Sequence, residues 1–135
     1  MLTVDARIDS LPQVLAFVDE QLEAADCPVR IQAQIDVAVE EIFVNIAHYA
    51  YREGGGKAEI TFRIDGDPAV AEITFRDSGV PFNPLESEDP DITLSAAERD
   101  IGGLGIYMVK KSMDRVSYEY RDGMNVLTLR KTLSL

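Results

Sequence analysis

The sequence predicts an α/β (α+β) two-layer sandwich, with three helices on one face of a mixed, mostly antiparallel sheet. Two observations lead to this fold class. Apolar residues recur at helical spacing in two segments, with a third helix expected at "GGLGIYMVKKSM", and two pairs of segments predict strands joined by short turns. Each strand therefore has one face to bury, as in an antiparallel sheet that is covered on a single side.

The size and charge of the chain bound the class of function. Its 135 residues, 46% hydrophobic and 27% charged, are expected to form one globular domain over residues 1–135. The net charge of -11 disfavours direct contact with nucleic acid or a membrane, and suits a basic protein segment or a ligand that binds with a cation. The lone Cys27 cannot form an internal disulfide and is expected to be half-buried. No segment reaches the roughly 18 apolar residues of a membrane span, so a cytoplasmic location is expected.

The first half of the chain is expected to hold one strand and two helices. Residues 2–8 alternate loosely and predict a first strand. Ser10 is the expected N-cap of a helix that continues to about Ala25, with Pro12 in its first turn, where a missing N–H does no harm. The segment "DCPV" interrupts this helix. Residues 29–51 predict a second helix, which ends at the glycines of "REGGG".

The second half is expected to hold two hairpins and a third helix. Residues 57–65 and 69–77 alternate around "DGDP" and predict a β-hairpin. Residues 80–101 lose regular pattern and are acidic, and a connection this long predicts a lid or binding loop. The segment "GGLGIYMVKKSM" predicts a third helix that opens with glycines. Residues 115–133 predict a second hairpin around Asp122-Gly123.

Three polar side chains are expected to share a face of the second helix. Glu41, Asn45 and His48 are spaced by four and three residues, and apolar residues occur nearly all round this helix, which predicts that it is largely enclosed. Polar groups in such surroundings need partners. They can pair with each other and the backbone. Alternatively a ligand completes the site, with the carboxylate as a general base and the amide oxygen as a magnesium ligand.

Two segments that contain glycine could complete such a site. Asp77 ends the third strand and Gly79 follows, which is either an ordinary turn or a carboxylate that reads an exocyclic amine beside an accessible backbone. Gly102, Gly103 and Gly105 open a helix, where backbone N–H groups and the helix dipole favour phosphate. A hinge for the preceding loop explains these glycines equally well.

The order and spacing of these motifs resemble the GHKL, or Bergerat-fold, ATP-binding family. This family includes histidine kinases, gyrase-type ATPases and the bacterial anti-sigma serine kinases. The segments "EEIFVNIAHYAY", "RDSGVPFNP", "GGLGIYMVKKSMDRV" and "NVLTLRK" are most similar to the anti-sigma branch. The resemblance runs from about Ile35 to the C-terminus, and it implies that residues 80–101 form an ATP lid.

The resemblance implies a role for each matching residue. Glu41 would be the general base, Asn45 would ligate Mg²⁺, and Asp77 would read the adenine amino group of ATP. His48 would orient the helix end or the lid rather than take part in chemistry. The implied nucleotide-binding set is Asn45, His48, Asp77, Gly79, Phe82, Gly102, Gly103, Leu104 and Gly105. Glu40 competes for the role of base but points about 100° around the helix from Glu41.

Charged side chains near the lid add further candidates. Arg99, Lys110 and Lys111 are either phosphate contacts or ordinary surface charges. The six carboxylates of the lid would repel a triphosphate unless they face solvent or a partner.

The resemblance implies an anti-sigma factor serine/threonine kinase. Such a protein would use ATP and Mg²⁺ to phosphorylate a serine or threonine on a STAS-type anti-sigma-factor antagonist, and would sequester a sigma factor. It would pair as a homodimer. The alternative is a non-catalytic ATP-binding module that switches partners. A stand-alone histidine-kinase or gyrase-like ATPase is disfavoured, because one sandwich leaves no room for a phosphoacceptor helix or a transducer domain.

Overall fold

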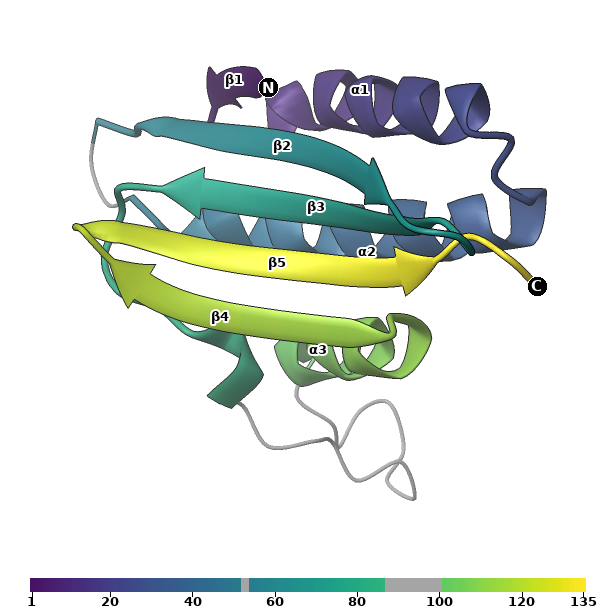
Figure 1. Cartoon of the computed structure of the whole chain (residues 1–135). Coiled ribbons are helices and arrows are strands. Elements are labelled where there is room, and N and C mark those ends of the chain that lie inside the picture. The colour runs from purple at the N-terminus through teal and green to yellow at the C-terminus, as the bar shows by residue number, and fades with distance from the viewer. Residues whose placement is uncertain (52–53, 87–100) are drawn as a thin grey trace.

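A computed structural model of the chain describes residues 1–51, 54–86 and 101–135, and of residues 101–104 it describes the backbone alone. The described residues form one sheet and three helices (Figure 1). The elements in chain order are β1 (Leu2–Asp5), α1 (Leu11–Ala24), α2 (Val29–Tyr49), β2 (Lys57–Asp65), β3 (Val70–Asp77), α3 (Ile101–Ser112), β4 (Arg115–Arg121) and β5 (Met124–Thr132), with 3-10 turns at Ile8–Ser10 and Pro84–Glu86.

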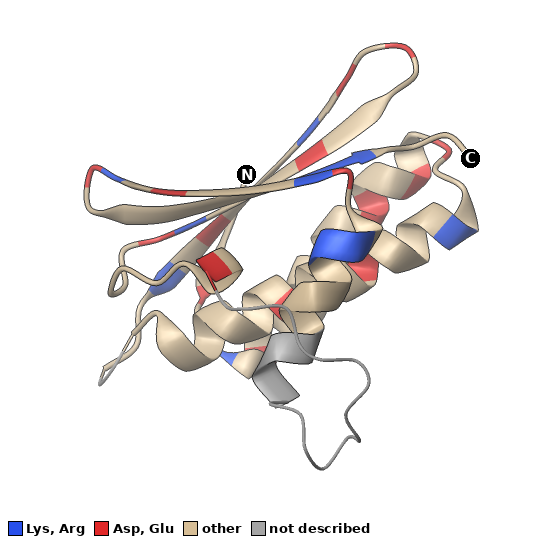
Figure 2. Ribbon diagram, turned by 90° about the horizontal axis from the view of Figure 1, so that it is seen from below, with Lys and Arg blue, Asp and Glu red and all other residues tan. Residues whose placement is uncertain are grey.

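The sheet has the strand order β1-β2-β3-β5-β4, and all three helices lie on the same side of it (Figures 1 and 2). This arrangement confirms the expected α/β sandwich. Every described strand pair is antiparallel, so the parallel pairing that a mixed sheet would contain is absent from the described strands. Among the described residues no helix combines the length and apolar character needed to cross a bilayer.

Both hairpins form where the turn residues predict them. The β2–β3 ladder pairs Ile60 with Phe75, and both side chains are buried. The β4–β5 hairpin turns through Asp122 and Gly123, which have φ angles of 54° and 78°. Two consecutive residues with positive φ match the twist of a two-residue hairpin, and an Asp-Gly pair adopts them at low cost.

The core lies between the sheet and the helices. Each strand contributes alternate residues to it, and each of α1 and α2 contributes one apolar stripe. Its largest fully buried side chains are Phe43, Phe75, Leu22, Ile35, Ile42, Ile60, Ile73 and Leu129. Burial of each such side chain contributes about 1.5–3 kcal/mol. The opposite face of the sheet is polar, with Arg130 donating to Glu72 at 3.0 Å.

The start of α1 differs from the prediction. Ser10 does not cap this helix: its own φ and ψ are -85° and -9°, which is helical, and its side chain makes no capping hydrogen bond. The reason is the 3-10 turn Ile8–Ser10, which leads directly into α1. Pro12 does lie in the first turn of α1, as predicted. The first strand is shorter than expected and ends at Asp5.

The predicted enclosure of α2 is wrong. Val37 is 53% exposed and Tyr49 is 54% exposed, and His48 is also exposed. Only one side of α2 faces the sheet, and the neighbouring helices leave part of the opposite side open to solvent. Glu41 and Asn45 are half-buried rather than fully enclosed.

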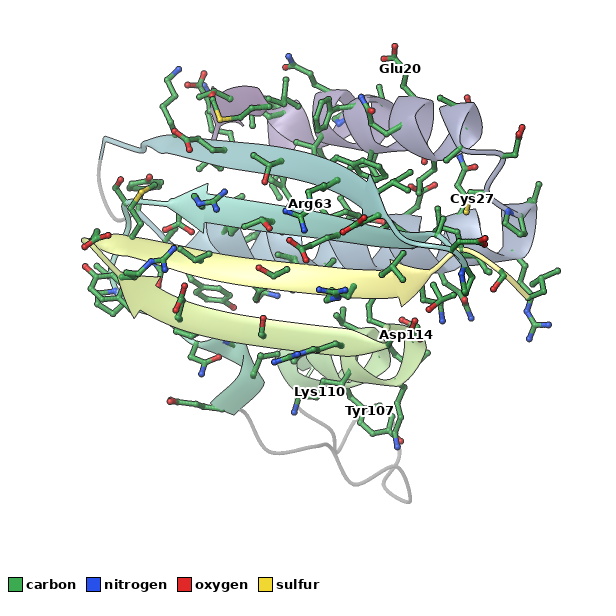
Figure 3. All side chains as sticks on the ribbon, in the orientation of Figure 1. Glu20, Cys27, Arg63, Tyr107, Lys110 and Asp114 are labelled. Carbon is green, nitrogen blue, oxygen red and sulfur yellow. The ribbon has the colours of Figure 1, made fainter. Side chains whose placement is uncertain are left out.

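A group of carboxylates lies between α1 and α2. Gln32 Nε2 donates to Asp19 Oδ1 at 3.1 Å and to Glu23 Oε1 at 3.4 Å. Asp36 Oδ1 is buried and no hydrogen-bond donor in the described part of the chain reaches it. Burial, followed by the proximity of Asp19, raises the pKa of Asp36 to about 7. Figure 3 shows Glu20, by contrast, pointing away from this contact into solvent.

Cys27 lies at the turn between α1 and α2 (Figure 3). It is half-buried, as predicted, and its Sγ donates to the Pro28 carbonyl at 3.5 Å. Burial raises the pKa of the Cys27 thiol.

Candidate nucleotide site

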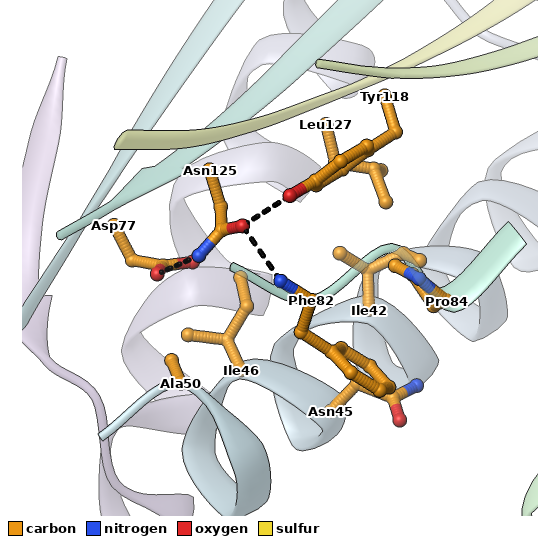
Figure 4. A pocket seen from close by; sticks show the side chains of 10 residues that line it. All are labelled: Ile42, Asn45, Ile46, Ala50, Asp77, Phe82, Pro84, Tyr118, Asn125 and Leu127. Carbon is orange, nitrogen blue, oxygen red and sulfur yellow. Dashed lines mark hydrogen bonds between the residues drawn. The ribbon is translucent and has the colours of Figure 1, made fainter. Parts of the chain in front are cut away.

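Asp77 lies at the end of β3 with only 3% of its surface exposed. Its Oδ1 accepts the Gly79 N–H at 2.9 Å and the Asn125 Nδ2 group at 2.9 Å. No donor among the described residues bonds to Oδ2. Because Asp77 lines a depression in the surface (Figure 4), Oδ2 is the acceptor available to a ligand there. The bond from the Gly79 N–H to Asp77 Oδ1 forms the Asx turn that "Asp-x-Gly" predicts.

Gly79 packs directly against the end of α2. Val80 N–H donates to the Ala50 carbonyl at 2.7 Å, and a Cβ placed on Gly79 would lie 2.0 Å from the same oxygen. The absence of a side chain at Gly79 therefore permits contact between the turn and the helix. This packing is a second reason for glycine here. The contact between Gly79 and a nucleotide base stays a prediction.

Tyr51 fastens the same turn from the other side. Its hydroxyl accepts the Ser78 N–H at 2.9 Å and donates to the Lys57 carbonyl at 2.6 Å. The ring covers Gly56, where a Cβ would lie 2.3 Å from ring atoms. The end of α2, the start of β2 and the turn after β3 are thus joined at one point.

The depression beside Asp77 has an apolar wall and a polar end. Its lining residues come from α2, the end of β3, the segment after it, and the two C-terminal strands: Ile42, Asn45, Ile46, Ala50, Asp77, Phe82, Pro84, Tyr118, Asn125 and Leu127 (Figure 4). The space over it is about 330 Å³, and this volume includes open solvent. The Phe82 ring stacks on Tyr49, with centroids 5.3 Å apart.

The polar residues of α2 separate into two groups. Asn45 lines the depression, and its Nδ2 donates to the Glu41 backbone carbonyl at 2.9 Å, which leaves Oδ1 as the atom that can take a cation. The Glu41 side chain instead reaches α3, because a Cβ on Gly105 would lie 2.0 Å from Glu41 Oε2. His48 is not among the lining residues, and its ring lies 6.1 Å from that of Tyr49. Glu40 is exposed.

The glycine motif occupies the first turns of α3. The helix begins at Ile101, so Gly102, Gly103 and Leu104 belong to its first turn, and Gly105 faces Glu41. The first N–H groups of a helix have no partner inside it, which makes this end suited to phosphate. The side chain of Leu104 lies outside the described part of the chain.

The charged candidates do not gather at the glycine end of α3. Lys110 and Lys111 lie in the last turn of that helix, roughly 12 Å along the axis from Gly102 at 1.5 Å per residue. Lys111 Nζ lies over the Tyr107 ring, 5.5 Å from its centroid. Arg99 and residues 87–100 of the expected lid lie outside the described residues.

Sequence reasoning assigned no role to two residues of this site, Tyr118 and Asn125, although Asn125 opens the quoted segment "NVLTLRK". Asn125 is 6% exposed, and Tyr118 donates its hydroxyl hydrogen to Asn125 Oδ1. Burial, with a smaller contribution from the charge of Asp77, raises the pKa of the Tyr118 phenol. One signal was present: Asn125 occupies an inward position of β5, in alternation with the buried Leu127 and Leu129.

The described residues thus form a sandwich in which a carboxylate at the end of β3 lies beside a helix, α2, that bears an acid and an amide. The sequence matches the histidine kinase-like ATPase domain over residues 4–131, and the chain belongs to that family.

Curated relatives agree with the resemblance to serine kinases. The serine-protein kinases RsbW of Bacillus mycoides (strain KBAB4) and Bacillus cereus (strain B4264) are each 34% identical over 95 residues, which is 67% of this chain and 58% of the relative. The serine/threonine-protein kinase BtrW of Bordetella bronchiseptica is 26% identical over 100 residues, or 74% of this chain and 70% of the relative. The match thus spans less than two thirds of the length of the RsbW proteins.

Proposed function

We propose that this chain is an ATP-dependent serine/threonine kinase that phosphorylates an anti-sigma-factor antagonist of the STAS type and sequesters a sigma factor. The observation that supports it most is the placement of Glu41 and Asn45. One turn of α2 directs a carboxylate to the glycine end of α3 and an amide to the depression beside Asp77. A nucleotide whose base lies at Asp77 would then extend its phosphates toward Glu41.

Each residue would have one task in phosphoryl transfer. Asp77 Oδ2 would accept a hydrogen bond from the adenine amino group, and the N–H groups at the start of α3 would bind phosphate oxygens. The oxygen of the substrate hydroxyl would bond to the γ-phosphorus while Glu41 accepts the hydroxyl proton. The bond between the γ-phosphorus and the oxygen that bridges it to the β-phosphate would break, and ADP would leave. Phe82, Gly79 and His48 would shape the pocket and the end of α2 rather than react.

Magnesium fits this site through Asn45. Its Oδ1 is a hard oxygen ligand that no described donor occupies. The described residues contain no group of three acidic, histidine or cysteine side chains that could hold a metal ion. The ion would therefore take most of its ligands from water and phosphate, as magnesium commonly does. Bound there, it would neutralise phosphate charge.

Glu41→Gln tests the proposal with little change in shape. The variant should bind ATP normally, but its rate of phosphate transfer should fall by about 100-fold or more, since glutamine cannot accept the proton. Glu40→Gln is the matched control, because this neighbouring carboxylate is exposed. The assay uses labelled ATP and a single-domain antagonist carrying a serine. Transfer by the Glu41 variant at the wild-type rate contradicts the role of Glu41 as the base.

The alternative is a non-catalytic module that binds ATP and switches partners. It predicts ATP binding without label on any antagonist, by wild type and variants alike. The kinase proposal also includes an ATP lid over residues 80–101 and a homodimer. It further includes a cytoplasmic location and no direct binding of nucleic acid. The net charge of -11 supports the last point and favours basic surfaces on the protein partners.

A further inference from the structure

We propose that Asn125 is a positioning residue that sets base specificity, by holding the Asp77 carboxylate in the orientation that reads an amine. The inference rests on the proposed nucleotide function and adds to it Asn125 of β5, the first residue of "NVLTLRK", for which the sequence predicted no role. Asn125 lies opposite Asp77 in the β3–β5 ladder, where alternation would otherwise place an apolar side chain.

All the hydrogen-bonding capacity of the Asn125 amide is used. Figure 4 shows its bonds to Asp77, Phe82 and Tyr118. Nδ2 donates to Asp77 Oδ1 and to the Val80 carbonyl, both at 2.9 Å. Oδ1 accepts the Phe82 N–H at 3.1 Å and the Tyr118 hydroxyl. A buried amide with these partners has one stable orientation, because turning it over would set its N–H groups against the Phe82 N–H and its oxygen against the Asp77 carboxylate and the Val80 carbonyl.

The consequence for Asp77 is directional. Oδ1 is held by two donors, the Gly79 N–H and the Asn125 amide, so the plane of the carboxylate is fixed. Oδ2, which no described donor binds, is then the acceptor that Asp77 can offer to a ligand in the depression. This is the arrangement that favours a base with an exocyclic N–H donor over one without it, because an unpaired buried carboxylate oxygen is costly.

Asn125 also fixes the backbone of residues 80–82. It binds the carbonyl of Val80 and the N–H of Phe82, whose ring lines the depression and stacks on Tyr49. The same amide therefore aligns the carboxylate and the ring that would contact one base. A purely structural role would fasten this turn without affecting which base binds, and that difference can be measured.

The experiment compares Asn125→Asp with Asn83→Asp in the full chain. Both substitutions add one negative charge and are nearly isosteric. Asn125→Asp replaces the donor to Asp77 by a carboxylate. The Asn83 side chain, among the described residues, bonds only through Oδ1, which accepts the Leu85 N–H at 2.9 Å, and an aspartate can keep that bond. Calorimetry gives the Kd of each protein for ATP and for purine riboside triphosphate, which lacks the exocyclic amine. Thermal unfolding verifies that each variant is folded at the temperature used.

Asn125→Asp should weaken ATP binding about 10-fold or more and analogue binding much less, so the preference for ATP over the analogue collapses. Asn83→Asp should leave this preference unchanged. If Asn125→Asp weakens both ligands equally, or neither, Asn125 has no part in specificity and the inference is overturned. If wild type binds ATP but shows no preference over the analogue, the inference fails as well. If wild type binds neither ligand, the proposed function itself has failed.

Tyr118→Phe serves if Asn125→Asp does not fold. It removes one hydroxyl donor to Asn125 Oδ1 and keeps the ring. ATP binding should weaken about 3-fold with analogue binding unchanged, because the amide is held less firmly. An unchanged ratio of the two affinities overturns the inference in this arm too.

Discussion

Gly105→Ala should disable the site while leaving the fold intact. A Cβ at this position would lie 2.0 Å from Glu41 Oε2, 2.7 Å from its Cδ and 3.3 Å from Oε1. The obstructing atoms belong to the free end of a half-buried side chain, which can rotate away. The carboxylate must move by about 1 Å or more to reach ordinary contact distance, and a displacement of that size can cost about 100-fold in rate.

The effect on stability should be small because two contributions oppose each other. Alanine in the interior of α3 is more favourable than glycine by about 1 kcal/mol. A strained rotamer at Glu41 costs about 0.5–1.5 kcal/mol. The free energy of unfolding should therefore change by no more than about 1 kcal/mol, while phosphoryl transfer falls by roughly 100-fold.

The assay for Gly105→Ala joins urea unfolding with single-turnover transfer from labelled ATP. Met108→Ala is the control, since Met108 lies on the same helix and is 51% exposed. Transfer at the wild-type rate by a folded Gly105→Ala protein would refute the reasoning, because the position of the Glu41 carboxylate would then be irrelevant to the reaction.

Two further changes test the packing. Gly79→Ala should lower the free energy of unfolding by about 1–3 kcal/mol in urea titration, because its Cβ would meet the Ala50 carbonyl carbon and oxygen at 2.4 and 2.0 Å and backbone cannot rotate away; unchanged stability would show that the turn can shift. Asp36 has its pKa raised from 3.8 to about 7, so between these values the folded chain binds more protons and loses stability as pH rises. The full shift corresponds to about 4 kcal/mol, and solvent screening reduces this to about 1–2 kcal/mol. Asp36→Asn should therefore stabilise the protein at pH 8 and not at pH 4, with exposed Glu20→Gln as the control; an equal effect at both pH values contradicts the shift.

Local chemistry explains what could be predicted of the fold. The second hairpin was predictable because Asp122 and Gly123 determine the turn by themselves. The strands followed from alternation, since each buries one face. Ser10 failed as a cap because sequence alone does not reveal that a 3-10 turn precedes the helix. The exposure of His48 was missed because an apolar helix does not show which of its sides lacks a neighbour.

The site was only partly visible in the sequence, since its contacts join distant segments. The motifs indicated Glu41, Asn45 and Asp77, whose roles in binding and catalysis stay predictions. The contact of Asn125 with Asp77 was not predicted because the two residues are 48 positions apart, and only the strand register brings them together. Gly79 is the opposite case, because its motif suggested contact with a ligand, whereas the structure shows a packing contact of its backbone with Ala50.

The central claim is that the depression beside Asp77 and the first turn of α3 bind one ATP together with magnesium. Isothermal titration calorimetry of the purified full chain with ATP, with and without magnesium chloride, tests it directly. The account predicts saturable binding of one nucleotide per chain that weakens when magnesium is withheld. Absence of binding heat at several temperatures with magnesium present would contradict it.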